Sequence, residues 1–166
     1  MTSAPPRGAG RTVSLRAASA GDDSWLAELF LHGRPELAAL PPQLIALQRQ
    51  AQRVQYTADF PGYADYLLTA DDRMDAGPIG CLSWWRDQQE HRLLDLTVHS
   101  AWRGQGIGRQ AIQLLARTAS SADRPLRLSV WSGNEPALRL YRSCGFQPDG
   151  AAGGYLFMRL LPGRER

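Results

Sequence analysis

Apolar and polar residues repeat along this chain with two different periods. Alternation at every second position is typical of a half-buried strand. It predicts six strands, over residues 12–17, 63–69, 79–86, 91–99, 126–131 and 153–161. Turns rich in charged residues, glycine and proline separate the three strands between residues 63 and 99, so we expect these three to form an antiparallel meander.

Four other segments show the spacing of three to four residues that is typical of an amphipathic helix. They begin near residues 22, 41, 107 and 134, and Gly33 and Gly145 end the first and the last. The apolar stripes of the first three are Trp25, Leu26, Leu29 and Phe30; Leu44, Leu47, Ala51 and Val54; and Ile107, Ala111, Leu114 and Leu115. The element order β-α-α-β-β-β-α-β-α-β predicts an α/β sandwich with a mixed sheet.

A glycine-rich loop follows the strand over residues 91–99 and leads into the third helix. Its sequence over residues 103–108 is Arg-Gly-Gln-Gly-Ile-Gly. Such a junction brings several main-chain N–H groups and the positive end of a helix dipole to one point, which suits a phosphate or pyrophosphate. The dinucleotide fingerprint fails because Arg109 stands where a further glycine is needed, and a P-loop fails because the chain has no lysine.

The pattern Arg-x-x-Gly-x-Gly of this loop resembles the acetyl-CoA pyrophosphate loop of the GCN5-related N-acetyltransferase (GNAT) family. Residues 134–146 read Asn-Glu-Pro-Ala-Leu-Arg-Leu-Tyr-Arg-Ser-Cys-Gly-Phe, and the family shows the same succession of Asn, Ala, Leu-Tyr and Gly-Phe. The resemblance is most specific over residues 91–146 and covers the rest only as an order of elements. It implies the acyl-CoA N-acyltransferase fold, with one N-acetyltransferase domain over residues 11–166.

The resemblance also implies roles for individual residues. In relatives, the strand before the loop pairs with the pantetheine arm near the position of Val98, an asparagine at the position of Asn134 contacts that arm, and a tyrosine at the position of Tyr141 sits beside the CoA sulfur. Asn134 and Tyr141 are seven residues apart and share a helix face, which suits both contacts. Tyr141 is the expected general acid, with a core tyrosine as the alternative. The implied cofactor-binding residues are Thr97, Val98, Arg103, Gly104, Gln105, Gly106, Ile107, Gly108, Asn134 and Tyr141.

A general base cannot be transferred from the family. Several members carry a glutamate early on the strand before the loop, and Arg92 occupies that position here. Asp95 lies on this strand and shares a face with Thr97 and His99, whereas Glu90 shares a face with Arg92. We rank Asp95 first and Glu90 second as the base that accepts the amine proton, directly or through water. A purely structural carboxylate is the alternative for each.

Composition excludes several function classes. A chain of 166 residues with 43% hydrophobic residues predicts one domain, and its first ten residues, rich in proline, glycine and alanine, are expected to be a disordered tail. There is no apolar run near the roughly 18 residues of a membrane span and no secretory signal, so we expect a cytoplasmic protein without a membrane partner. All 19 basic residues are arginines scattered among acidic ones, which argues against nucleic acid as a partner.

Neither a metal site nor a disulfide is expected. Cys81 and Cys144 fall within a predicted strand and a predicted helix, where a small core residue is the simpler interpretation. His32 and His91 have no companions at metal-ligand spacing. The tandem Trp84-Trp85 places one ring on each face of a strand, so one is expected in the core and the other can wall the acceptor cleft. A homodimer is compatible with these features.

These observations predict an acetyl-CoA-dependent N-acetyltransferase that moves an acetyl group to a primary amine of a small molecule or peptide by direct attack in a ternary complex. The alternative is a non-catalytic acyl-CoA sensor or interaction module, which Arg92 in place of the glutamate keeps open. The identity of the acceptor amine is also undecided. One segment of the chain is acidic, and it can either attract a cationic amine or simply be a solvated turn. Its residues are Asp59, Asp65, Asp71, Asp72 and Asp75.

Overall fold

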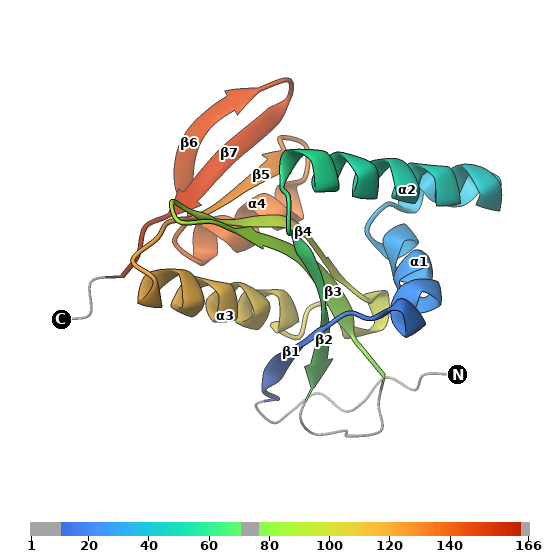
Figure 1. Cartoon of the computed structure of the whole chain (residues 1–166), viewed down its shortest axis with the longest axis horizontal. Coiled ribbons are helices and arrows are strands. Elements are labelled where there is room, and N and C mark those ends of the chain that lie inside the picture. The colour runs from blue at the N-terminus through green and yellow to red at the C-terminus, as the bar shows by residue number, and fades with distance from the viewer. Residues whose placement is uncertain (1–10, 71–76, 164–166) are drawn as a thin grey trace.

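The computed structural model describes residues 11–70 and 77–163. Its centre is one seven-stranded sheet with the strand order β1-β2-β3-β4-β5-β7-β6 (Figure 1). The strands are β1 (Val13–Ala17), β2 (Ala64–Ala70), β3 (Gly80–Arg86), β4 (His91–Val98), β5 (Leu126–Trp131), β6 (Gln147–Ala152) and β7 (Tyr155–Leu160). Short 3-10 helices cover Ala20–Asp22, Pro35–Ala39 and Ser100–Trp102.

Neighbouring strands of this sheet are antiparallel except β4 and β5, which run parallel. This is the mixed sheet that the element order predicts. The strand β6 is an addition that the sequence analysis missed. It contains Pro148, Asp149 and Gly150, residue types that are depleted in strands, and it is tolerated because it lies at the sheet edge with mostly exposed residues.

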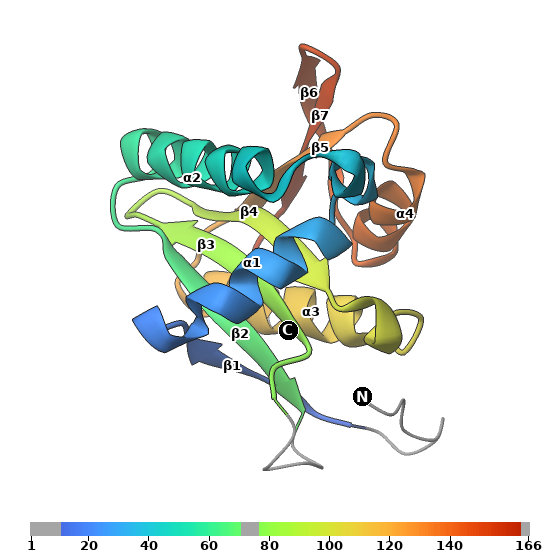
Figure 2. The same ribbon diagram turned by 90° about the vertical axis from the view of Figure 1, so that its right-hand side faces the viewer.

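Four helices cover the two faces of the sheet. They are α1 (Asp23–His32), α2 (Pro42–Asp59), α3 (Ile107–Ser121) and α4 (Glu135–Ser143). Figure 2 shows α1 crossing in front of the strands with α2 above it, and α3 behind them. The helix α4 belongs to the α3 side, because its Leu138 is part of the same buried cluster as Ile112 and Leu115 of α3. No helix within residues 11–70 and 77–163 is long and apolar enough to cross a membrane.

The main apolar core lies between the sheet and the α3–α4 side. Of the predicted stripe of α3, Ile107, Ala111 and Leu115 are at most 2% exposed there, and Leu114 is partly buried. Successive residues of a strand point to opposite faces. Leu68 of β2 and Leu82 of β3 therefore point into this core. The residues next to them on each strand point to the opposite face, toward α1 and α2.

The apolar stripe that predicts α2 faces solvent. Leu44, Leu47 and Val54 are 46%, 60% and 63% exposed. The half-buried side of α2, which lies over the sheet, instead carries polar residues such as Arg49 and Tyr56. The periodicity thus indicates the helix correctly, but the polar sheet surface below it selects the polar side of the helix for contact.

The parallel strands β4 and β5 are paired over only part of their length. Residues 91–93 of β4 pair with residues 126–128 of β5, and no pairing continues beyond them. The two strands separate from this point onward. Because α4 follows β5 directly, the separation also brings α4 opposite the second half of β4.

A bulge in β4 reinforces this separation. The register against β3 shifts between the pairs Ser83–Asp95 and Trp84–Leu93, which leaves Leu94 as the additional residue. The hydroxyl group of Tyr56 on α2 donates to the carbonyl oxygen of Leu94 at 3.1 Å. The bulge is therefore tied to α2, on the side of the sheet that carries the polar residues.

Candidate active site

The separation of β4 and β5 opens a cleft of about 760 Å³. Residues 93–97 of β4 and 129–131 of β5 form two of its walls, and Asn134 and Tyr141 of α4 form a third. Arg34, which follows α1, lines it as well. Within the described residues the β4 edge toward β5 has no strand partner beyond residue 93. Its main-chain groups can therefore pair with an extended ligand in the cleft.

The glycine loop connects the end of β4 to the start of α3. Gly104 and Gly106 have φ angles of 72° and 78°, a conformation that glycine adopts without strain. A Cβ atom at either position would meet no atom within 4 Å. Gly106 is the N-cap of α3, and no side chain caps this helix end. The first-turn N–H groups of α3 thus begin beside open space, with the helix dipole behind them.

The side chains of this loop hold it in place. The Arg103 guanidinium donates to the carbonyl oxygens of Val98, at 3.0 Å, and of His32. The side-chain amide of Gln105 donates to the carbonyl oxygen of Ala101 at 3.2 Å. Because these groups bind neighbouring main chain, an anion at the loop would be bound mainly by main-chain N–H groups.

The third glycine of the loop serves helix packing. A Cβ atom on Gly108 would lie 3.1 Å from the side chain of Leu140 on α4. The start of α3 therefore lies directly against α4. The contact on α4 is Leu140, the residue that precedes Tyr141. Of the ten predicted cofactor-binding residues, Thr97, Asn134 and Tyr141 line the cleft. The other seven are Val98 at the end of β4, residues 103–106 of the loop, and Ile107 and Gly108 at the start of α3.

The helix α4 presents Asn134 and Tyr141 to the cleft. The side-chain oxygen of Asn134 accepts the N–H of Ala137 at 3.2 Å and caps the helix, while its NH2 group is not used in the cap. Burial raises the pKa of Tyr141, and the charge of Asp95 raises it further. The tyrosine hydroxyl therefore keeps its proton at neutral pH. Its ring also packs against Phe146, with ring centroids 5.7 Å apart. Tyr141 therefore both lines the cleft and contributes to side-chain packing.

Asp95 is the carboxylate of β4 that lines the cleft. Burial raises its pKa, while Arg34 at 3.8 Å and the main-chain N–H of Leu96 partly oppose this rise. The side chain is still 28% exposed, so a ligand can reach it. A carboxylate with a raised pKa in a cleft is suited to accept a proton from an amine.

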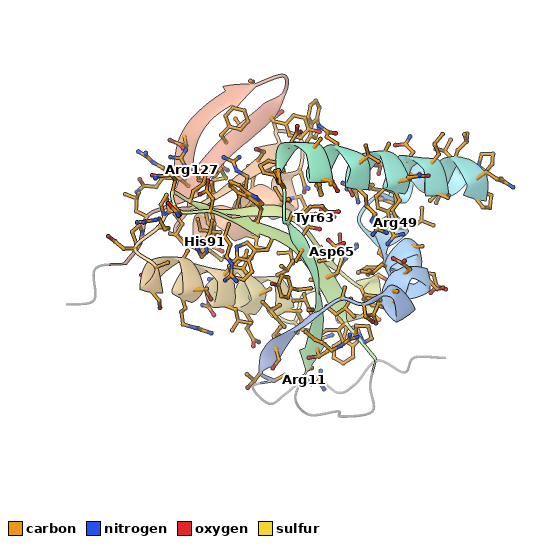
Figure 3. The ribbon with its side chains drawn as sticks, in the orientation of Figure 1. Arg11, Arg49, Tyr63, Asp65, His91 and Arg127 are labelled. Carbon is orange, nitrogen blue, oxygen red and sulfur yellow. The ribbon has the colours of Figure 1, made fainter. Side chains whose placement is uncertain are left out.

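Glu90 lies outside the cleft. Its carboxylate forms ion pairs with Arg92 at 2.7 Å and with Arg127 at 2.9 Å. Arg127 in turn pairs with Asp149 at 2.6 Å and lies far from the Arg49 end of the molecule (Figure 3). These contacts indicate a structural ion-pair network, and the geometry favours Asp95 over Glu90 as the proton acceptor.

The tandem tryptophans separate to the two faces of β3. Trp84 is 8% exposed within the core, and Trp85 donates its ring N–H to the carbonyl oxygen of Pro61 at 3.0 Å. Neither lines the cleft. Trp131 and Tyr155 line it instead, with ring centroids 5.5 Å apart. The sequence analysis did not single out these two residues, because an aromatic residue at a strand end carries no signal of what lies beside it.

The acidic segment of the sequence is divided by the structure. Asp65 points from β2 into the space between the sheet, α1 and α2, and Asp59 is exposed at the end of α2. Asp71, Asp72 and Asp75 lie outside the described residues. Within residues 11–70 and 77–163 no group of three or more His, Cys, Asp or Glu side chains could hold a metal ion.

Comparisons with known proteins agree with this geometry. The family model described as an acetyltransferase (GNAT) domain matches residues 64–148. This chain belongs to the GNAT family. The match extends from β2 into β6, and it therefore includes the strands β4 and β5 beside the cleft, the glycine loop and α4.

Individual relatives add detail to the family assignment. A Bacillus subtilis protein provisionally named a ribosomal-protein alanine N-acetyltransferase is 30% identical over 94 residues, which are 56% of this GNAT chain and 60% of the relative. The chain thus matches less than two thirds of that protein's length. Two solved structures share the fold. The PaiA N-acetyltransferase of Thermoplasma acidophilum, in complex with coenzyme A, has a TM-score of 0.67 at 16% identity and covers 90% of this chain and 99% of its own.

The second structure is provisionally named an acetyltransferase, comes from Salmonella typhimurium and contains acetyl-CoA. It has a TM-score of 0.58 at 19% identity and covers 93% of this chain and 96% of its own. Together these neighbours confirm the acyl-CoA N-acyltransferase fold.

Proposed function

We propose that this GNAT protein is an N-acetyltransferase that transfers the acetyl group of acetyl-CoA to a primary amine by direct attack in a ternary complex. The observation that carries the proposal is the cleft between β4 and β5, which gathers an unpaired main-chain edge, Asp95 and Tyr141 around one space. Fold neighbours that hold coenzyme A or acetyl-CoA support it.

The residues around the cleft fit acetyl-CoA. Gly104, Gly106 and the uncapped start of α3 would receive the pyrophosphate, since the main chain there is unobstructed by side chains. The β4 edge beyond residue 93 would pair with the amide groups of the pantetheine arm. The NH2 group of Asn134 would donate to the same arm, and Tyr141 would lie at the sulfur end.

The chemistry follows from where these groups lie. Acetyl-CoA supplies a thioester carbonyl carbon, to which the amine nitrogen forms a bond. Asp95 accepts the proton that the amine must lose, and a main-chain N–H of the β4 edge stabilises the negative charge on the carbonyl oxygen. As the carbon–sulfur bond breaks, the Tyr141 hydroxyl donates its proton to the sulfur. Tyr141 then regains a proton from solvent, and Asp95 releases to solvent the proton it took from the amine. The products are the acetylated amine and free CoA thiol.

A thermal shift and a turnover assay together test this function. Acetyl-CoA should raise the Tm, whereas NAD and ATP should not, because the glycine spacing fits neither nucleotide motif. Release of CoA thiol is then measured with polyamines, amino acids, aminoglycosides and an alanine-initiated peptide, the last suggested by the name of the Bacillus relative. The chain has no lysine, so its own side chains offer no acceptor amine. Equal stabilisation by NAD or ATP would contradict the proposal.

The alternative function is an acyl-CoA sensor on the same fold. It predicts a rise in Tm with acetyl-CoA and no thiol release with any amine. Arg92 is compatible with this alternative, because it pairs with Glu90 and brings no carboxylate to the cleft. Asp95 and Tyr141 favour the enzyme, since a sensor has no use for a proton acceptor and a proton donor in the same cleft.

A further inference from the structure

A second, much smaller cavity adjoins the cleft at Asp95. It has a volume of about 40 Å³ and lies between the sheet, α1 and α2. Gln52, Tyr56, Asp95 and Thr97 line both spaces, so these four side chains form the boundary that the two spaces share. A space of this size holds only a few water-sized groups. It therefore suits the head group of a small acceptor, with the reacting amine at the junction beside Asp95.

The floor of this cavity carries two carboxylates in one cross-strand row. Asp65 of β2 pairs in register with Ser83 of β3, and Ser83 pairs with Asp95 of β4. Cross-strand partners share a face, and two strand spacings separate the outer members by roughly 10 Å at the backbone. The Ser83 hydroxyl donates to Asp65 at 2.6 Å, but Asp65 forms no ion pair with any described residue. One carboxylate at the floor thus lacks a cation.

The roof of the cavity carries an excess of positive charge. Arg49 and Arg53 of α2 both line it. Within the described part of the chain they share a single carboxylate, Asp23, at 3.2 Å and 3.3 Å. Figure 3 shows Arg49, Tyr63 and Asp65 around the space enclosed by α1, α2 and the sheet. Two guanidinium groups with one acid between them can bind a further carboxylate from a ligand.

An outer cleft reaches this cavity from the surface. It is lined by Asp23, Arg53, Tyr63 and Asp65 among others, and the last three of these also line the cavity. An acceptor can therefore approach from the α1–α2 side, while the cleft between β4 and β5 is occupied by acetyl-CoA.

We propose that the acceptor is a free diamino acid, an α-amino acid whose linear side chain ends in a primary amine, as in lysine or ornithine. Its side-chain amine reacts beside Asp95, its α-ammonium group binds Asp65, and its α-carboxylate binds Arg49 and Arg53. This assignment rests on the proposed N-acetyltransferase function and names its substrate class.

Each charged group of the cavity contributes to this choice. A diamine without a carboxylate would leave the two guanidinium groups facing a dication. An amino acid without a second amine would leave Asp65 without a cation. The separation of Asp65 and Asp95 by two strands matches two amines joined by a short aliphatic chain, rather than two amines on adjacent carbons. Phe30 and Tyr56 supply ring surface for that chain.

Matched acceptors test the proposal in the CoA-thiol assay. Lysine and ornithine are compared with cadaverine, which lacks the carboxylate, with ε-aminocaproate, which lacks the α-amine, and with norleucine, which lacks the side-chain amine. The diamino acids should exceed each analogue in kcat/KM at least about tenfold, because each analogue loses one charge-assisted contact. Mass spectrometry should place the acetyl group on the side-chain nitrogen.

Substitutions then assign each contact. Asp65→Asn should bring the ratio of kcat/KM for lysine over ε-aminocaproate close to one, because the α-amine loses its partner. Arg49→Gln should reduce the ratio for lysine over cadaverine in the same way. Asp59→Asn, at the exposed end of α2 and outside the cavity, is the control and should change neither ratio. A preserved rise in Tm with acetyl-CoA shows that each variant is folded.

The outcomes separate this inference from the proposed function. Transfer to other amines, with cadaverine or a single-amine acceptor equal to lysine, would overturn the diamino-acid assignment and leave the transferase standing. Binding of acetyl-CoA without transfer to lysine or ornithine would overturn it too. The absence of any acetyl-CoA binding would instead remove the proposed function itself.

Discussion

The two faces of the sheet use the same three strands in opposite ways. Toward α3, the cross-strand row Tyr66–Leu82–Leu96 is apolar, and Leu82 is fully buried. The adjacent cross-strand row, Asp65–Ser83–Asp95, is displaced from it by one residue on each strand. This second row faces α1 and α2 and lines the polar cavity. A single step along a strand thus separates the core from the site. Substitutions on the two faces should therefore affect different properties.

The largest effect on stability should come from the α3 face. Leu82→Ala removes a fully buried side chain and should lower the free energy of unfolding by about 3 kcal/mol, through lost burial and the cavity it leaves. Asp65→Asn on the other face should cost less than about 1 kcal/mol, because the amide oxygen can still accept from Ser83. Urea unfolding measures both. Equal losses would show that the two faces contribute alike to stability.

The next effect concerns the cofactor on the α3 side of the cleft. Gly106→Glu places a side chain and a negative charge at the expected pyrophosphate position and should weaken acetyl-CoA binding at least about 100-fold, so that the Tm no longer responds to the ligand. Gly62→Glu is the matched control. Gly62 has a similar φ of 82° and the same open surroundings, but it precedes β2. Retained binding in the Gly106 variant would show that the loop has another role.

A moderate effect should appear in turnover. Tyr141→Phe removes the proposed proton donor and keeps the packing against Phe146. It should lower kcat on the order of tenfold to 100-fold with little change in the Kd for CoA. Tyr66→Phe, on the α3 face of β2, serves as the control. Unchanged kcat in the Tyr141 variant would assign this residue to packing alone.

The smallest effect is a pH dependence of stability on the α1–α2 face. Burial raises the pKa of Asp95 in the folded protein, so ionisation of this carboxyl opposes folding. Its favourable contribution is complete below the unfolded pKa of about 4 and is lost as the pH rises through the folded pKa. Asp95→Asn should therefore gain Tm relative to the parent as the pH rises from about 3 to about 7. A constant Tm difference across this range would contradict the argument, and Asp59→Asn controls for loss of a surface charge.

Much of this protein could be predicted from local sequence alone. The helix α3, the glycine loop and the capped start of α4 at Asn134 depend on residues within one or two turns of each other. The seven-residue spacing of Asn134 and Tyr141 determines their common face whatever the rest of the chain does. For the same reason the resemblance to the GNAT family was visible without a structure, and the fold and family it implied are confirmed.

Tertiary structure decided what the local pattern left open. The row Asp65–Ser83–Asp95 depends on strand register between segments 12 to 18 residues apart, and alternation within one strand contains no information on register. The orientation of α2 depends on the polar surface below it. The choice between Asp95 and Glu90 depends on the cleft, which Asp95 lines, and on Arg92 and Arg127, which pair with Glu90. Sequence determines which chemical groups the chain carries. It also determines which residues share a face of one helix or strand, because that follows from the backbone geometry of the element. Only packing determines which of them meet in one cavity, because that is set by pairing between distant segments.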